Sequence, residues 1–102
     1  MPYGSWINDF PPGFFLAVHM AAFVIGAGFA WLALKREQRL LGAAFSLFAA
    51  AELVYMTYHL DWTVFLFAHT IAEVLDLSAF VLVFAAAVYS TVRRPVLGTS
   101  EA

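Results

Sequence analysis

Residues 13–34 of this 102-residue chain form an unbroken apolar stretch, GFFLAVHMAAFVIGAGFAWLAL, without Asp, Glu, Lys or Arg. As an α-helix this stretch is roughly 33 Å long at 1.5 Å per residue, which is enough to cross the hydrocarbon core of a bilayer. The whole chain is 64% hydrophobic and only 12% charged, whereas a soluble domain is about a quarter charged. So small a chain has too little interior to bury that much apolar surface, so we expect lipid to be its solvent.

Two further apolar stretches follow the first. Residues 40–60 carry one carboxylate, Glu52, and residues 62–92 form a run longer than one bilayer needs. The longer run must tilt or project from one surface. Because the connections at 35–39 and around Asp61 are short, consecutive helices should be antiparallel neighbours. We therefore predict an all-α integral membrane protein of three antiparallel transmembrane helices.

The orientation of the helices follows from the positions of the cations. All five Lys and Arg residues fall within 35–39 or at 93–94, and these two places lie on the same side of the membrane in the predicted topology. The opposite side carries Asp9 and Asp61 and no cation. Positively charged loops stay in the cytoplasm, so we expect a multi-pass protein of the cell membrane with its N-terminus outside and its C-terminus inside.

The remaining features set the boundaries of the domain and exclude several functions. We expect one domain over residues 1–102, with 1–12 as an outer interfacial segment and 95–102 as a flexible cytoplasmic tail. The chain has no Cys and a net charge of -2, which excludes thiolate metal sites and gives no basis for a nucleic-acid partner. No hydrolase or phosphate-binding motif is present, so we do not expect the chain to be an enzyme on its own.

Ionisable side chains inside the predicted spans need an explanation, because each costs a few kcal/mol in a bilayer. Helical spacing places these groups on one face of each helix. His19, Glu52 and His69 come from three different helices, and each is expected roughly 9–12 Å below the outer surface. The full set is His19, Glu52, His59, His69, Glu73 and Asp76. Such a layer is typical of a functional site.

One hypothesis is a transition-metal site whose ligands are His19, Glu52, His69 and Glu73. Imidazole and carboxylate suit Zn, Fe or Cu, and sites of this kind occur in the cores of helix bundles. A second form of the hypothesis uses His19 and His69 as axial ligands of a tetrapyrrole, either haem or chlorophyll. The function would then be that of a small membrane subunit that binds a metal or a metal-containing cofactor.

Two alternatives remain open. Chains of Asp, Glu and His form intramembrane proton relays, and here a relay would start at the outer mouth and descend to the middle of the membrane. Its members would be His59, Glu52, His69, Glu73 and Asp76. Alternatively, the same groups hydrogen-bond one another and fix the register of the helices, in which case the chain is a structural accessory subunit of a membrane complex.

Partners are expected in the membrane besides lipid. The ladder of small residues Ala22, Gly26 and Ala30 marks the packed face of helix 13–34, since such ladders let helices approach closely. Three helices cannot enclose so many ionisable groups, so we expect a homo-oligomer or a complex with other membrane subunits. In length and layout the chain resembles the small Glu-bearing subunit of respiratory complex I and the membrane anchors of succinate dehydrogenase. This resemblance concerns architecture alone and assigns no residue a role.

Overall fold

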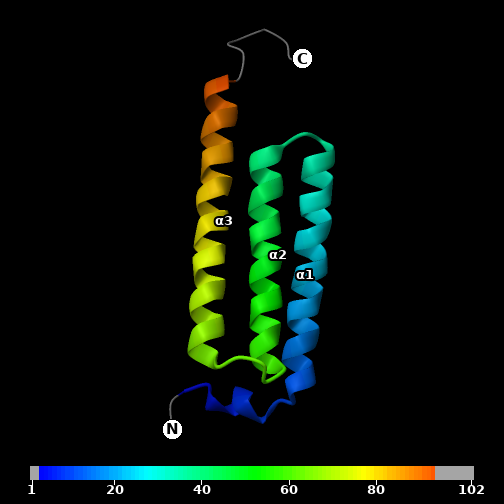
Figure 1. Ribbon diagram of the computed structural model, residues 1–102, viewed down its shortest axis with the longest axis vertical. Helices are drawn as coiled ribbons and strands as arrows, with labels where there is room; N and C mark the ends of the chain where they lie inside the picture. The colour runs from blue at the N-terminus through cyan, green and yellow to red at the C-terminus, as the bar shows by residue number, and fades with distance from the viewer. Residues whose placement is uncertain (1–2, 94–102) are drawn as a thin grey trace.

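The computed structural model describes residues 3–93, without the side chain of Arg93, and the regular secondary structure of this part of the chain is all helical (Figure 1). A short 3-10 helix, η1 (Ser5–Asp9), is followed by α1 (Pro12–Lys35), α2 (Arg39–His59) and α3 (Phe65–Arg93). Each of the three α-helices is long and apolar enough to cross a membrane, as the sequence predicts. The expected tail at 95–102 and the cation Arg94 lie outside the described residues.

The first two helices match their predicted bounds to within one residue, but α3 begins at Phe65 instead of residue 62. A tight turn before it causes the difference. The backbone N–H of Trp62 donates to the Thr57 carbonyl at 2.9 Å, and the hydroxyls of Thr57 and Thr63 are 2.9 Å apart. Asp61 has a φ of 65°, a left-handed conformation that interrupts a helix and that Asp tolerates better than most residues.

The three α-helices lie in a row with α2 in the middle (Figure 1). Both α1 and α3 pack against α2, and within the described residues they do not pack against each other. The α1–α2 connection and the α2–α3 connection lie at opposite ends of the row, and η1 lies across the second of these ends. We call these the loop end and the η1 end. With 29 residues, α3 is roughly 44 Å long and extends past the α1–α2 connection.

Small side chains form the contacts between the helices. The buried apolar side chains of the described residues are all Ala except Met56, and Gly26 and Gly42 are buried as well. Large apolar side chains such as Phe29, Leu66 and Phe80 point outward. Small residues at helix contacts permit close van der Waals packing, which holds helices together in lipid. The exposed apolar shell is what a bilayer would solvate.

The predicted ladder of small residues lies at the contact between α1 and α2. Gly26 and Ala30 are buried there, and Ala22 is half-buried. A Cβ built on Gly26 would lie 2.6 Å from Cδ2 of Phe48, so only Gly fits without movement of that ring. The ladder therefore serves packing within the chain.

Candidate functional site

A hydrogen bond between His19 of α1 and Glu52 of α2 is the centre of the polar cluster. Nδ1 of His19 lies 2.5 Å from Oε1 of Glu52. Glu52 is the one charged residue in the buried core of the described part of the chain. His19 is seven positions after the first residue of α1, and Glu52 is seven positions before the last residue of α2, so both lie about two turns from the η1 end. The two groups that the sequence predicts at the same depth are thus in contact.

Aromatic rings extend this pair toward the η1 end and across α2. The His59 ring stacks on His19, with centroids 5.2 Å apart, and on Phe15, with centroids 5.1 Å apart. The His19 ring also stacks on the Tyr55 ring, with centroids 5.0 Å apart. His59 is the last residue of α2, which places it nearest the η1 end. An imidazole at the end of the helix is therefore in contact with the His19–Glu52 pair below it.

Tyr55 links this group to the third helix. Its hydroxyl donates a hydrogen bond of 3.1 Å to Oε2 of Glu73 on α3. Glu73 is exposed, whereas Tyr55 is half-buried. The side chains of His19, Tyr55 and Glu73 therefore form one connected line over α1, α2 and α3. This line is possible only because α2 lies between the other two helices.

Asp76 lies beside Glu52 and Glu73 and has an unusual environment. Its Oδ1 is buried and has no hydrogen-bond partner among residues 3–93. Asp76 is close enough to Glu52 and Glu73 for their charges to act on it, and residues 40–92 contain no Lys or Arg. Buried polar atoms are nearly always hydrogen-bonded. Of these three acids, Glu52 is hydrogen-bonded to His19 and Glu73 to Tyr55, while Asp76 keeps a buried oxygen without a partner in the described part of the chain.

His69 lies apart from His19, the other predicted imidazole ligand. Its ring stacks on Phe65, with centroids 5.1 Å apart, and it is only four residues from the start of α3. It therefore lies closer to the η1 end than the sequence predicts, because α3 begins three residues later than predicted. His19 and His69 are on helices that do not pack against each other.

Of the four predicted metal ligands, the structure brings His19 and Glu52 together as one pair, whereas His69 and Glu73 are a pair only by their spacing of one helical turn on α3. Among the residues that the structure describes, no group of three or more His, Asp or Glu side chains is arranged to hold a metal ion. Metal and tetrapyrrole binding remain predictions, and each pair would need donors from elsewhere.

Tyr55 and Phe15 are absent from the site residues predicted by sequence, although both contact the cluster. The signal for Tyr55 was its spacing: it lies three residues after Glu52 and four before His59, on the same helical face. Phe15 gave no such signal, because its contact with His59 depends on how α1 and α2 pack.

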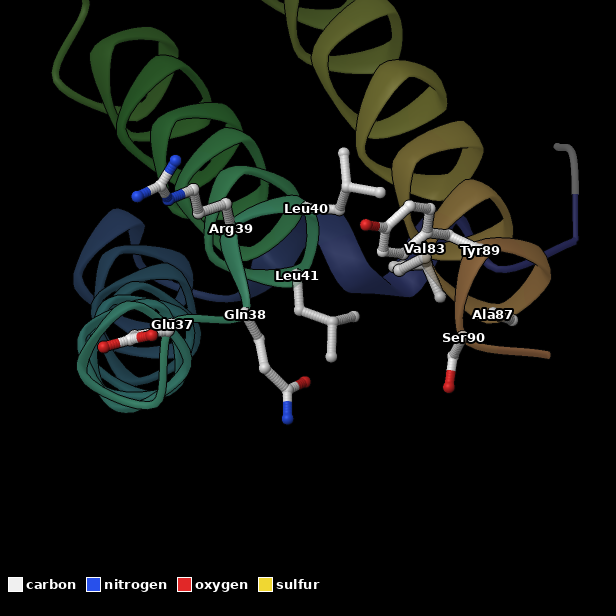
Figure 2. A pocket seen from close by; sticks show the side chains of 10 residues that line it. Glu37, Gln38, Arg39, Leu40, Leu41, Val83, Ala87, Tyr89 and Ser90 are labelled. Carbon is white, nitrogen blue, oxygen red and sulfur yellow. The ribbon is translucent and has the colours of Figure 1, made fainter. Parts of the chain in front are cut away.

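A groove lies between α2 and α3 near the loop end, away from the polar cluster (Figure 2). Its volume is about 850 Å³. Leu40 and Leu41 of α2 and Val83 of α3 extend into it, while Glu37 and Arg39 at its rim point away. The wall of the groove is mainly apolar. It lies where the longer α3 extends past the end of the shorter α2.

Comparisons with protein families, with curated proteins and with solved structures give no match for this chain.

Proposed function

We propose that the three helices cross the cell membrane as an antiparallel unit with the η1 end outside and the loop end in the cytoplasm. Lys35, Arg36 and Arg39 support this orientation, since all three lie at the loop end. Asp9 and Asp61 lie at the η1 end. The side that keeps the cations is cytoplasmic by the positive-inside rule. Nζ of Lys35 also lies 4.6 Å from the centre of the Trp31 ring, and Trp is common at membrane interfaces.

We propose further that the polar cluster takes up protons from the outer side and holds them inside the membrane, as the outer half of a proton pathway. The observation that carries this proposal is the position of Asp76. Its buried Oδ1 has no partner among residues 3–93, and the charges of Glu52 and Glu73 act on it. Acids in such a place are stable when they share protons, because like charges in a medium of low dielectric constant repel strongly.

The order of the side chains gives the pathway a direction. His59 is nearest the outer side and contacts His19, which is hydrogen-bonded to Glu52. An imidazole can accept a proton at one nitrogen and release one from the other. The two imidazole rings are stacked, so we propose that water carries the proton from His59 to His19, which then passes it to Glu52 through their hydrogen bond. Asp76 is the deepest acid of the group. Beyond it, the Thr91 hydroxyl is bonded to the Ala87 carbonyl of its own helix, and we propose that groups of another chain continue the path to the cytoplasm.

Infrared spectroscopy of the protein in lipid vesicles tests this proposal. Protonated carboxylic acids give a C=O band that carboxylates lack, and the band shifts in D2O only if the proton exchanges with water. We expect a band that grows on acidification, loses intensity in Asp76→Asn and Glu52→Gln, and shifts rapidly in D2O. His59→Phe should slow the shift. Asp61→Asn, in the turn before α3, is the matched control and should leave the band of the cluster unchanged. Equal spectra for wild type, Asp76→Asn and Glu52→Gln would contradict the proposal.

Metal or cofactor binding is a second candidate function, and the geometry of α3 favours one form of it. His69 and Glu73 lie one helical turn apart, and Glu73 is exposed, so this pair is accessible to a metal that takes its other ligands from elsewhere. Metal analysis and an absorption spectrum of the purified protein test this. Stoichiometric Zn, Fe or Cu that is lost in His69→Ala would support a metal site, and a Soret band would support haem. If neither proton uptake nor a metal is found, the chain is best explained as a structural subunit.

A further inference from the structure

An exposed carboxylate marks one side of α3. Glu73 lies eight residues into α3, within the stretch long and apolar enough to cross a membrane. Tyr55 provides its one hydrogen bond among the described residues, to Oε2. A charged or half-satisfied carboxyl that faces lipid costs a few kcal/mol. Another surface that brings polar partners would remove this cost.

The same side of α3 carries a group complementary to Glu73. His69 precedes Glu73 by four residues and is half-buried, so the two side chains are neighbours on one face of the helix. Leu66 and Phe80 extend this face and are 71% and 72% exposed. We call His69, Glu73, Leu66 and Phe80 the α3 face. On this face an acid, Glu73, and a base, His69, lie between the apolar side chains of Leu66 and Phe80.

We infer that a second copy of this chain packs on the α3 face, so that two α3 helices meet in parallel about a two-fold axis along the membrane normal. In such a pair a residue of one helix lies beside residues three or four positions away on the other. His69 of each copy can therefore contact Glu73 of the other, and the symmetry makes this contact twice. The α3 face is self-complementary in charge, which favours a second copy over an unrelated partner.

The arrangement of the row makes α3 the suitable helix. It is at the edge of the row, and of the described α-helices only α2 packs against it, so none of these helices covers its other side. The other edge helix, α1, has no Asp or Glu between Gly13 and Leu34 and offers no exposed acid to neutralise. This inference goes beyond the proposed proton uptake and does not depend on it.

Cysteine cross-linking tests the interface, and the chain has no Cys of its own. Phe80 is seven residues after Glu73, on the same side of α3, whereas Ser78 is roughly 140° around the helix. Both are exposed. In lipid vesicles with a large excess of lipid, a short thiol cross-linker should convert most of Phe80→Cys to dimer and little of Ser78→Cys. Equal cross-linking of the two variants, or none of Phe80→Cys, would overturn the inference.

Exchanging His69 and Glu73 distinguishes a loss of this interface from misfolding of the variants. His69→Glu alone puts only acids on the α3 face, and Glu73→His alone puts only imidazoles there. Each should weaken dimerisation at least tenfold, as measured by sedimentation equilibrium in detergent. The double variant His69→Glu/Glu73→His restores an acid and a base at the same spacing and should recover most of the wild-type affinity. A wild-type protein that stays monomeric at high protein-to-lipid ratio, or a double variant no better than the single ones, would contradict the model of two α3 helices.

Discussion

Nδ1 of His19 and Oε1 of Glu52 are 2.5 Å apart, although 33 residues separate them in the chain. The pair joins α1 to α2 at the most buried acid of the described residues. A polar contact between helices in a membrane contributes on the order of 1 kcal/mol. Loss of one partner costs more than that, because the other stays buried without a hydrogen bond.

We therefore expect His19→Phe to lower the free energy of unfolding by about 1–3 kcal/mol. Phe keeps the ring that stacks on Tyr55 and His59 and removes only the hydrogen bond to Glu52. The double variant with Glu52→Leu should lose less than the sum of the two single variants. Unfolding in mixed detergent micelles, followed by circular dichroism, measures these values. Ser46→Ala is the control, since that hydroxyl bonds the Gly42 carbonyl of its own helix. Strict additivity of the two single variants would argue against the pair.

Gly26→Ala should weaken the contact between α1 and α2. The new Cβ would lie 2.6 Å from the Phe48 ring, and overpacking of this kind costs about 1–3 kcal/mol. Gly28→Ala is a matched control two residues away, where nothing lies within 4 Å of the added Cβ. That variant should be neutral or up to about 1 kcal/mol more stable, because Ala favours a helix over Gly. Equal stabilities in the same micelle assay would show that Phe48 moves away freely.

Asp76→Asn should stabilise the protein while it reduces proton uptake. The amide keeps the shape of the side chain and removes one of three neighbouring acids. We expect a gain of about 1 kcal/mol at neutral pH, in the range seen when a strained functional group is replaced. Thermal or detergent unfolding gives the sign of the change. Asp61→Asn should be silent, since Asn also tolerates the positive φ at that turn.

The topology is testable with single cysteines in an otherwise Cys-free chain. Asn8 in η1 and Gln38 in the α1–α2 connection are both exposed and lie at opposite ends of the row. In intact cells a membrane-impermeant maleimide should label Asn8→Cys and leave Gln38→Cys unlabelled until the cells are lysed. The opposite labelling pattern would show that the orientation is the reverse of the proposed one, and that protons enter from the cytoplasmic side.

Sequence alone determined the three apolar helices and the ends of the first two. A span depends on the length and hydropathy of one continuous stretch, and these are local properties of the chain. Residues 13–34 and 40–60 therefore predict α1 and α2 closely. The late start of α3 depends on the turn in which Trp62 bonds back to Thr57, and the apolar character of residues 62–64 hides that turn.

Only the tertiary structure decided which polar groups meet. Helical spacing shows that His19, Glu52 and His69 each lie on a particular face, but the rotation of each helix and the order of the row come from packing between distant residues. Because small residues bring both α1 and α3 against α2, His19 contacts Glu52, and Tyr55 reaches Glu73. The same packing keeps His69 away from His19. The sequence thus defined the set of ionisable side chains, and the position of α2 between its neighbours determined their pairs.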